Sequence, residues 1–379
     1  MFAPFALVAN LASEVFLSLA SPAQWPLAPS TSYHRFFDVQ AHRGGRGNTI
    51  ENTLPSFAWG LIDGATTLEL DNGITKNCVQ DGHVVVWHDV EITPEKCVDT
   101  HPVYPGDPDF PYVGKYIANL TLAQLRTIDC GSKRQRNYPM QLTYPGTRIS
   151  TLQEVFDFVS CADHRHEVLW NIESKIDAQH PNRTRGVMDF VEKQHAVFES
   201  SPYKGSITYQ SFDWRTIIAM KQLDSSIAVS ALIEDETAFM PDNSTSPWLA
   251  GLRLEDFPGP TVFEQIAQAA HFIGADILSP SAESTWTPVE DPDMAGYVPF
   301  TTREMVEEGH RLGLLVKPWT VNRMNIVDQL LDWKVDGIIS DYPDVVRRHV
   351  KQRGLPTAPK LPKQRVLKCL EEHLAKQRI

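Results

Sequence analysis

Two histidines end short apolar segments, at positions where an enzyme could use them as acid and base. His42 ends FFDVQAH, and His88 ends HVVVWH and is followed by Asp89. An imidazole titrates near neutral pH, so one ring can accept a proton while another donates one. Arg43 follows His42 directly, and a guanidinium can donate two parallel hydrogen bonds to a phosphate. These residue types indicate acid–base chemistry on an anionic substrate.

Three carboxylates repeat with the period of a β-strand. Glu69 and Asp71 are two positions apart in TTLELD, so their side chains point to one face with Cα atoms about 6–7 Å apart. Glu173 stands in EVLWNIE, two residues before Lys175. Carboxylates that meet at one place repel one another unless a cation lies among them, and such an all-oxygen set suits Mg²⁺ or Ca²⁺. The alternative is two plain ion pairs, Glu69 with Arg43 and Glu173 with Lys175.

Eight apolar, β-branched segments alternate with helical patterns after residue 35, which is typical of βαβ units on a parallel sheet. Eight repeats over about three hundred residues predict an α/β fold, the TIM (β/α)8 barrel, rather than a six-stranded open sheet. The C-terminal strand ends of such a barrel carry the active site, so we expect one polar mouth. The predicted strands are 36–42, 66–71, 167–173, 205–211, 226–233, 275–279, 314–320 and 336–341, and the polar mouth comprises His42, Arg43, Glu69, Asp71, Glu173, Lys175, Gln210, Trp319 and Asp341.

An extra strand, 83–88, follows the second barrel strand, and the region after it is rich in Pro, Gly, Tyr and Asp. A long loop inside a compact domain is usually a lid or a substrate-binding insertion. We predict three parts: an N-terminal leader or segment at 1–35, a barrel at 36–350 with an insertion at about 89–148, and a basic C-terminal tail at 351–379. The tail is expected to carry a short amphipathic helix on the outside of the barrel. Predicted helices include 53–63, 151–162, 213–223, 301–311 and 325–333.

Composition narrows the class of partner. The 379 residues are 42% hydrophobic and 22% charged, which is a globular composition. The formal net charge is −12 and most basic residues are scattered, which argues against nucleic acid as a partner. No segment after residue 30 approaches the roughly 18 apolar residues that a membrane span needs. A small-molecule substrate is therefore expected.

The N-terminus and the cysteines favour the secretory pathway, with the cytoplasm as the alternative. The first 25 residues are apolar and end in small residues, but they lack a basic start and contain Glu14. Three N-glycosylation sequons and five cysteines without metal-ligand spacing agree with secretion. The first candidate disulfide joins Cys97 to Cys130, and the second joins Cys78 to Cys97.

Seven sequence blocks carry a family resemblance. HRGGRGNTIENTLPSF, LELD, DGHVVVWHD, NIESK, YQSFDW, KPWTVN and VDGIISDYPD occur in this order between about residues 38 and 345. Together they resemble the glycerophosphodiester phosphodiesterase family, especially its secreted-type microbial members. The resemblance implies a metal-dependent phosphodiesterase on a TIM barrel that yields an alcohol and glycerol 3-phosphate. Four extra residues, 77–80, lengthen the turn before His88 relative to the usual family pattern.

The resemblance also implies roles for individual residues. Glu69, Asp71 and Glu173 match the ligands of a divalent ion, Mg²⁺ or Ca²⁺, and His42 and His88 match the general acid and base. The phosphate would be held by Arg43 and Lys175. Glu51 of the ENT block would orient Arg43 or His42, and Trp319 would form an apolar wall for glycerol or pack in the core.

Two other functions remain open at this point. One is a phospholipase D-like enzyme on the same barrel that acts on lysophospholipids or sphingolipids, against which the intact ENT block argues. The other is a non-catalytic barrel that binds ligands. The full set of ionisable groups argues against that function, because such groups are costly to bury without use.

Overall fold

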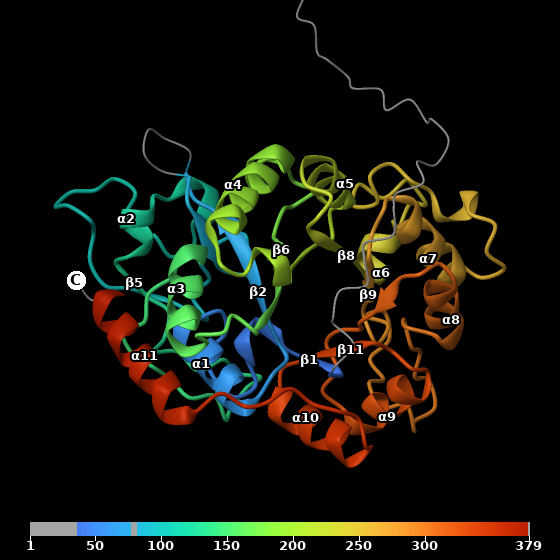
Figure 1. Cartoon of the computed structure of the whole chain (residues 1–379). Helices are drawn as coiled ribbons and strands as arrows, with labels where there is room; N and C mark the ends of the chain where they lie inside the picture. The colour runs from blue at the N-terminus through green and yellow to red at the C-terminus, as the bar shows by residue number, and fades with distance from the viewer. Residues whose placement is uncertain (1–35, 77–81, 378–379) are drawn as a thin grey trace, which may run out of the picture.

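The computed structural model describes residues 36–76 and 82–377. The expected leader at 1–35 and Cys78 lie outside the described residues. Eight parallel strands form a sheet in the order β10-β9-β8-β7-β6-β2-β1-β11 (Figure 1). Their bounds are β1 Asp38–Ala41, β2 Thr67–Ile74, β6 Leu169–Ser174, β7 Ile207–Ser211, β8 Ala228–Ile233, β9 Ile277–Pro280, β10 Leu315–Val316 and β11 Gly337–Ser340.

The sheet closes on itself through irregular hydrogen bonds between its two ends. Asp336 N donates to Val316 O at 2.9 Å, and Ile339 N donates to Pro318 O at 3.0 Å. The TIM-barrel prediction is therefore confirmed, and each predicted strand overlaps an observed one. The predicted strand 314–320 is regular only at Leu315–Val316, since Pro318 has no N–H to continue the ladder.

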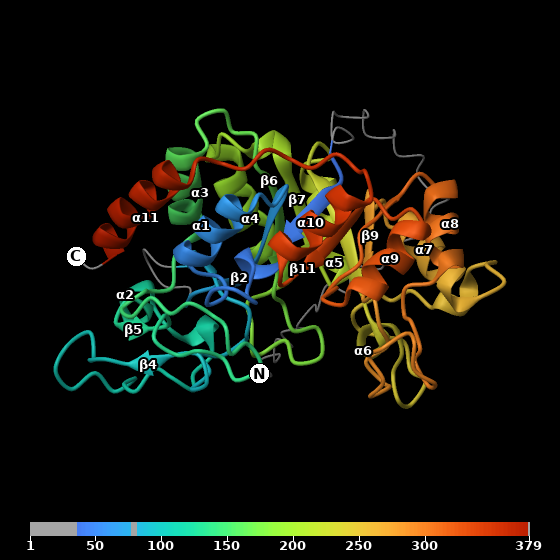
Figure 2. The same cartoon turned by 90° about the horizontal axis from the view of Figure 1, so that it is seen from below.

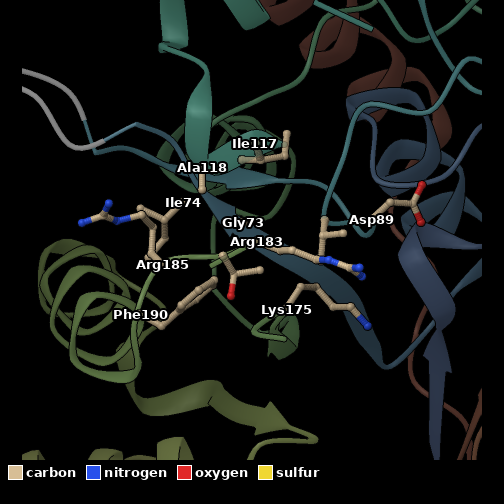
Figure 3. Close-up of a pocket in the computed structure, with 11 residues that line it drawn as sticks. Gly73, Ile74, Asp89, Ile117, Ala118, Lys175, Arg183, Arg185 and Phe190 are labelled. Carbon is tan, nitrogen blue, oxygen red and sulfur yellow. The ribbon is translucent and has the colours of Figure 1, made fainter. Parts of the chain in front are cut away.

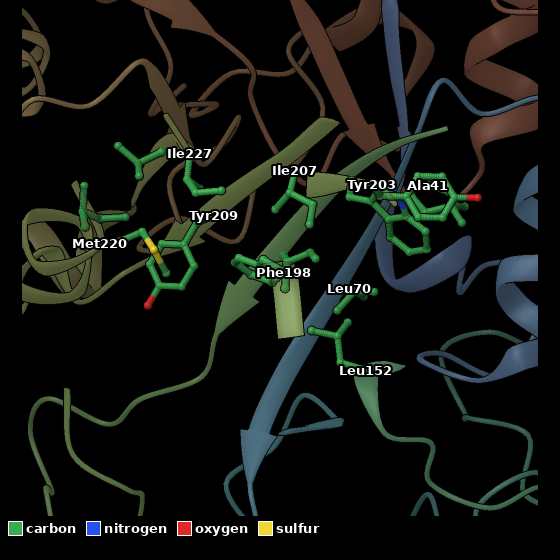
Figure 4. Packing of buried hydrophobic residues seen from close by; sticks show 14 of the residues in the cluster. Ala41, Leu70, Leu152, Phe198, Tyr203, Ile207, Tyr209, Met220 and Ile227 are labelled. Atoms are coloured by element: carbon green, nitrogen blue, oxygen red, sulfur yellow. The ribbon is translucent and has the colours of Figure 1, made fainter. Parts of the chain in front are cut away.

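Helices surround the barrel, and the strands bury apolar side chains against them (Figures 1 and 4). Leu68 and Leu70 of β2 belong to this outer core, whereas the alternate residues Glu69 and Asp71 face the other way. A capping box starts α3, because the Thr151 side chain accepts from Glu154 N and the Glu154 side chain accepts from Thr151 N. The helices are α1 Leu54–Asp63, α2 Leu122–Leu125, α3 Leu152–Ala162, α4 Val187–Ser200, α5 Trp214–Leu223, α6 Asp235–Ala238, α7 Val262–Phe272, α8 Arg303–Arg311, α9 Met324–Asp332, α10 Pro343–Gln352 and α11 Lys363–Gln377.

The insertion after β2 has a small core of its own. The hairpin strand β3, Val84–Val86, pairs antiparallel with β2 as predicted, and the strands β4 (Val98–Asp99) and β5 (Ile128–Asp129) follow with α2. Figure 2 shows α2, β4 and β5 gathered on one side of the barrel. A disulfide joins Cys97 to Cys130, which confirms the first predicted pairing and excludes Cys97 as a partner for Cys78.

The last helix, α11, packs on the outside of the barrel against α1 and α3 (Figure 1). Val366 and Leu370 are buried in that contact. A second disulfide, which we did not predict, joins Cys161 of α3 to Cys369 of α11. In the described part of the chain, no helix has both the length and the apolar character that a membrane crossing requires.

Candidate active site

Three carboxylates from two neighbouring strands meet at the C-terminal mouth of the barrel. Parallel pairing sets Asp71 of β2 opposite Glu173 of β6, and Glu69 precedes Asp71 by two residues. All three side chains are buried, and one oxygen from each lies within 4.8 Å of the others. The structure thus brings together the whole predicted ligand set.

Hydrogen bonds fix the orientation of these carboxylates. Glu69 accepts from the backbone N of Arg43 at 2.7 Å and from Gln210 Nε2 at 2.9 Å. Asp71 Oδ2 accepts from Asn52 Nδ2 at 2.7 Å, but its buried Oδ1 has no hydrogen-bond partner. A buried, unpaired carboxylate oxygen beside two other carboxylates fits a cation site.

The pKa values of the cluster also favour a cation site. Burial, then the charge of Asp71, raises the pKa of Glu69 well above its usual range. Burial likewise raises the pKa of Glu173 to about 7, although Lys175 opposes this rise. The repulsion among these three buried carboxylates is relieved when a divalent ion binds between them. The three residues could therefore hold a metal ion.

Arg43 lies at the centre of the charged groups. It follows β1 in a left-handed conformation, with φ of 52°. Its Nη1 lies 3.1 Å from Glu51 Oε1 and its Nε lies 3.5 Å from Asp71 Oδ2. Gly44 allows the tight turn, because a Cβ there would meet Ser56 Oγ at 2.4 Å. Glu51 was expected to orient Arg43 or His42, and in the structure it binds Arg43.

Lys175 forms an ion pair with Glu173, at 2.8 Å between Nζ and Oε1. Burial alone would lower the pKa of Lys175, but Glu173 and Asp71 raise it, so the ammonium stays charged. One of the two ion pairs considered from the sequence is therefore present. The other ion pair, between Glu69 and Arg43, is absent: Glu69 accepts a hydrogen bond from the backbone N–H of Arg43, whereas the guanidinium of Arg43 binds Glu51.

His42 is oriented by a carboxylate from the last strand. Its Nδ1 lies 2.6 Å from Asp341 Oδ1. Arg46, Tyr138 and Asn322 also bind Asp341, which fixes the position of its carboxylate. Burial, then Arg46 and Arg43, lowers the pKa of His42 to about 4. The ring is therefore neutral at pH 7, and with Nδ1 bound to Asp341 its Nε2 is the atom left for acid–base work.

His88 is held in a similar way by the residue after it. Its Nδ1 lies 2.8 Å from Asp89 Oδ1. Lys96 of the insertion bridges Asp89 and Glu51, with Nζ at 2.6 Å and 2.7 Å from their oxygens. Burial, then Arg43 and Lys175, lowers the pKa of His88 well below its usual range. Both histidines are thus paired with carboxylates and both are influenced by Arg43.

Trp319 lies at the mouth next to a second aromatic ring. Its indole N–H donates to Ser279 O at 2.9 Å, and its ring meets Phe212 edge to face with centroids 5.3 Å apart. Lys175 Nζ is 5.5 Å from the centroid of Phe212. Both aromatic rings are half-buried, so Trp319 keeps an apolar surface next to Phe212, the ring that Lys175 contacts.

Sequence reasoning gave no role to several residues that complete the site. Asn52 had a signal, since it follows Glu51 in the ENT block, and Asp341 was placed in the mouth but not assigned to His42. The sequence offered no signal for Lys96, because its contacts depend on how the insertion folds back. The residues without a predicted role are Arg46, Asn52, Lys96, Tyr138, Asn322 and Asp341.

The fold and site define a TIM-barrel hydrolase of phosphoric diesters. The model of the glycerophosphoryl diester phosphodiesterase family matches residues 42–345, and the chain belongs to this family. A glycerophosphodiester phosphodiesterase of Bacillus subtilis (strain 168) is 25% identical over 311 residues, 81% of this chain and 84% of the relative.

Two further comparisons extend this result. A lysophospholipase D of Mus musculus is 31% identical over 159 residues, 41% of this chain and 44% of the relative. The structure of an Oleispira antarctica phosphodiesterase in complex with the product sn-glycerol-3-phosphate is similar at a TM-score of 0.57 and 18% identity, covering 83% of this chain and 97% of the other.

Proposed function

We propose that the protein hydrolyses glycerophosphodiesters to an alcohol and glycerol 3-phosphate with the help of a divalent ion and two histidines. The single observation that carries the proposal is that Asp71 of β2 lies opposite Glu173 of β6, with Glu69 beside them. Family membership and the product complex of the Oleispira antarctica phosphodiesterase support the same chemistry.

Glu69, Asp71 and Glu173 would hold Mg²⁺ or Ca²⁺. Such an ion, when bound, neutralises the phosphodiester charge and helps to position the attacking oxygen. Arg43 and Lys175 add hydrogen-bond donors for the phosphate oxygens, and both are already held in place by carboxylates. The uncharged glycerol carbons would lie against Trp319.

The two histidines move the protons. One neutral ring takes the proton of the attacking hydroxyl, which for a glycerol diester can be the neighbouring hydroxyl of glycerol itself. The other ring, protonated when the anionic substrate raises its pKa, gives its proton to the departing alcohol as the P–O bond breaks. Water then opens the cyclic phosphate. His42 and His88 have equivalent carboxylate partners, so either could take either role.

The test is the release of glycerol 3-phosphate from a panel of glycerophosphodiesters, with and without EDTA. We expect activity that EDTA removes and added metal restores. His42→Ala and His88→Ala should each abolish turnover while metal affinity remains. His310→Ala is the matched control, because His310 also pairs with a carboxylate, Asp336, but lies on the outer surface. Full activity in either site variant would remove that histidine from the mechanism.

A second candidate is a lysophospholipase D activity, which the partial similarity to the mouse protein favours. Glycerophosphocholine and lysophosphatidylcholine share a headgroup and differ by an acyl chain, so the ratio of their turnover distinguishes the two functions. Hydrolysis of neither would favour a binding protein without catalysis.

We infer further that the protein enters the secretory pathway. Two disulfides suit an oxidising compartment. The three sequon asparagines, Asn119, Asn182 and Asn243, are exposed and accessible for glycosylation. The mass of the protein from its native source, before and after treatment with an N-glycosidase, tests this inference. An unmodified mass with free thiols would contradict it.

A further inference from the structure

Glu69 is held from inside the barrel and not from the cavity beside the mouth. That cavity lies next to Lys175, between Ile117 and the loop at 183–185, and its volume is about 10 Å³, roughly the space of one water molecule (Figure 3). Glu69 is not among the residues that line it. The side chain that donates to Glu69 is the amide of Gln210, which belongs to the barrel interior.

Three buried amides, those of Asn171, Gln40 and Gln210, form a hydrogen-bonded network inside the barrel, which we call the amide network. Asn171 of β6 donates through Nδ2 to Gln210 Oε1 at 2.9 Å and to Gln40 Oε1 at 2.8 Å. Gln210 Nε2 donates in turn to Glu69 Oε1 at 2.9 Å, and Gln40 Nε2 donates to Asp38 Oδ2 at 2.8 Å. Because β2 separates β6 from β1 in the sheet, the contact of Asn171 with Gln40 spans the interior.

The two carboxylates at the ends of the amide network determine how each amide is oriented. Glu69 and Asp38 can only accept hydrogen bonds when they are ionised. Each glutamine must therefore turn its N–H groups to its carboxylate and its carbonyl oxygen to Asn171. Asn171 must then donate twice, which an amide nitrogen can do. Its Oδ1 is buried and, in the described part of the chain, has no hydrogen-bond partner, so the donor side of Asn171 is the side that the network uses.

The end of the network at Asp38 has further partners. Asp38 is the first residue of β1 and lies at the end of that strand away from the mouth. Its Oδ2 also accepts from Lys317 Nζ at 2.9 Å, and its Oδ1 accepts from Thr67 Oγ1 at 2.6 Å. Loss of Gln40 would therefore leave the carboxylate of Asp38 paired.

The end at Glu69 depends more strongly on the network. The backbone N–H of Arg43 donates to Oε2 of Glu69, and Gln210 donates to Oε1. Without the amide of Gln210, the carboxylate can turn away from Asp71 and Glu173, with which it forms the candidate metal site. A hydrogen-bond partner that fixes a metal ligand increases the metal affinity, because the ligand is already oriented before the ion binds.

We propose that Asn171 is a positioning residue of the metal site, which fixes the amide of Gln210 and through it the carboxylate of Glu69. The inference rests on the proposed function, because it takes Glu69 as a metal ligand. Gln210 and Gln40 are both 2% exposed and both accept from Asn171, yet only Gln210 leads to the mouth. Gln210 therefore acts in metal binding, whereas Gln40 acts in the stability of the fold.

Calorimetric titration with Mg²⁺ and, separately, with Ca²⁺ tests the proposal. Gln210→Met should weaken binding about 10- to 100-fold, the usual effect of removing the hydrogen-bond partner of a metal ligand. Asn171→Leu should weaken binding about tenfold for the same reason. When it is added to Gln210→Met, Asn171→Leu should cost less than about a further twofold, because the amide through which it acts is already absent.

Gln40→Met is the matched control, because Gln40 has the same residue type, burial and partner as Gln210. It should leave the metal affinity within about twofold of the wild-type value. An equal loss of affinity in Gln40→Met and Gln210→Met would overturn the proposal. The same conclusion would follow if Asn171→Leu left the affinity unchanged, or if it weakened binding as much in Gln210→Met as in the wild type.

Two further measurements keep the test decisive. If Asn171→Leu does not fold, Asn171→Ala replaces it, since it removes the same donors and adds no bulk. Absence of metal binding in the wild type would refute the metal-dependent function instead. Urea unfolding of the metal-free variants then shows whether Asn171 acts through Gln210: the loss of stability in the double variant should be smaller than the sum of the two single losses, and additive losses would refute the link.

Discussion

Nδ1 of His42, at the end of the first strand, lies 2.6 Å from Oδ1 of Asp341, which follows the last strand. The contact lies at the C-terminal ends of β1 and β11, which pair in parallel. It orients the ring and sets the tautomer that leaves Nε2 free. The pairing of the first and last strands therefore also positions the histidine ring.

Asp341→Asn should lower kcat on the order of 10²-fold or more, because the amide no longer holds His42 in the working tautomer. Metal affinity should stay near the wild-type value, since Asp341 does not touch the carboxylate cluster. Steady-state kinetics and metal titration measure the two quantities. Asp336→Asn, which alters the surface pair with His310, is the control. A wild-type kcat in Asp341→Asn would show that His42 does not depend on this contact.

Metal binding should strengthen as the pH rises through about 7. The pKa of Glu173 is raised to about 7 and that of Glu69 is raised well above its usual range, so as the pH falls these groups take up protons that a metal ion must displace. Calorimetric titration with Mg²⁺ or Ca²⁺ in buffers of different ionisation enthalpy measures the protons released.

Glu283 provides the control for this titration. Burial, then the charge of Glu290, also raises its pKa to about 7, but the charges that act on it are those of Glu290 and Arg323 and not those of the carboxylate cluster. Glu283→Gln should therefore leave the metal affinity and its pH dependence as they are in the wild type. An affinity that is constant between pH 6 and 8 would refute the role of these carboxylates as ligands.

His42 should make the fold less stable in acid. The pKa of its ring is about 4 in the folded protein and about 6.5 in an unfolded chain. Between these values the unfolded chain binds a proton that the folded protein does not, so the free energy of unfolding falls as the pH falls from 6.5 to 4. In His42→Gln the free energy of unfolding should fall less over this pH range, by on the order of 1–3 kcal/mol compared with the wild type.

Urea denaturation at pH 7.5 and pH 4.5 checks this sign. The comparison of variant with wild type isolates His42, because raised carboxyl pKa values such as that of Glu173 act in the opposite direction. An equal loss of stability in both proteins would contradict the low pKa of His42.

Lys96 should act as a positioning residue for both halves of the site. It links Glu51, which holds Arg43, to Asp89, which holds His88. Lys96→Met should lower kcat/KM by about tenfold or more and shift the pH profile, since the positive charge between the carboxylates of Glu51 and Asp89 is lost. Lys96→Arg should restore part of the activity. Lys133→Met is the control, because Lys133 belongs to the same insertion but donates to the backbone oxygen of Pro94 instead. A lower melting temperature with unchanged kinetics would assign Lys96 a structural role only.

The sequence predicted the parts of this molecule that depend on local pattern. Alternation along β2 and β6 was enough to place Glu69, Asp71 and Glu173 on one face, and strand order then brought them together. The disulfide between Cys97 and Cys130 spans a single insertion and was found for that reason.

Contacts between distant segments could not be predicted in this way. Cys161 and Cys369 are 208 positions apart, and their pairing depends on where the last helix docks. The bridge from Lys96 to Glu51 depends on the path of an insertion without regular periodicity. Such contacts follow from three-dimensional packing, which a one-dimensional pattern does not encode.

The disulfide between α3 and α11 has a practical consequence for proteolysis. The segment that joins α10 to α11 is largely exposed at residues 353–356, where a protease can reach the backbone. A single cut there would yield two polypeptides that still migrate as one species on a non-reducing gel and separate only after dithiothreitol. The terminal helix can thus lose its peptide connection and remain part of the molecule.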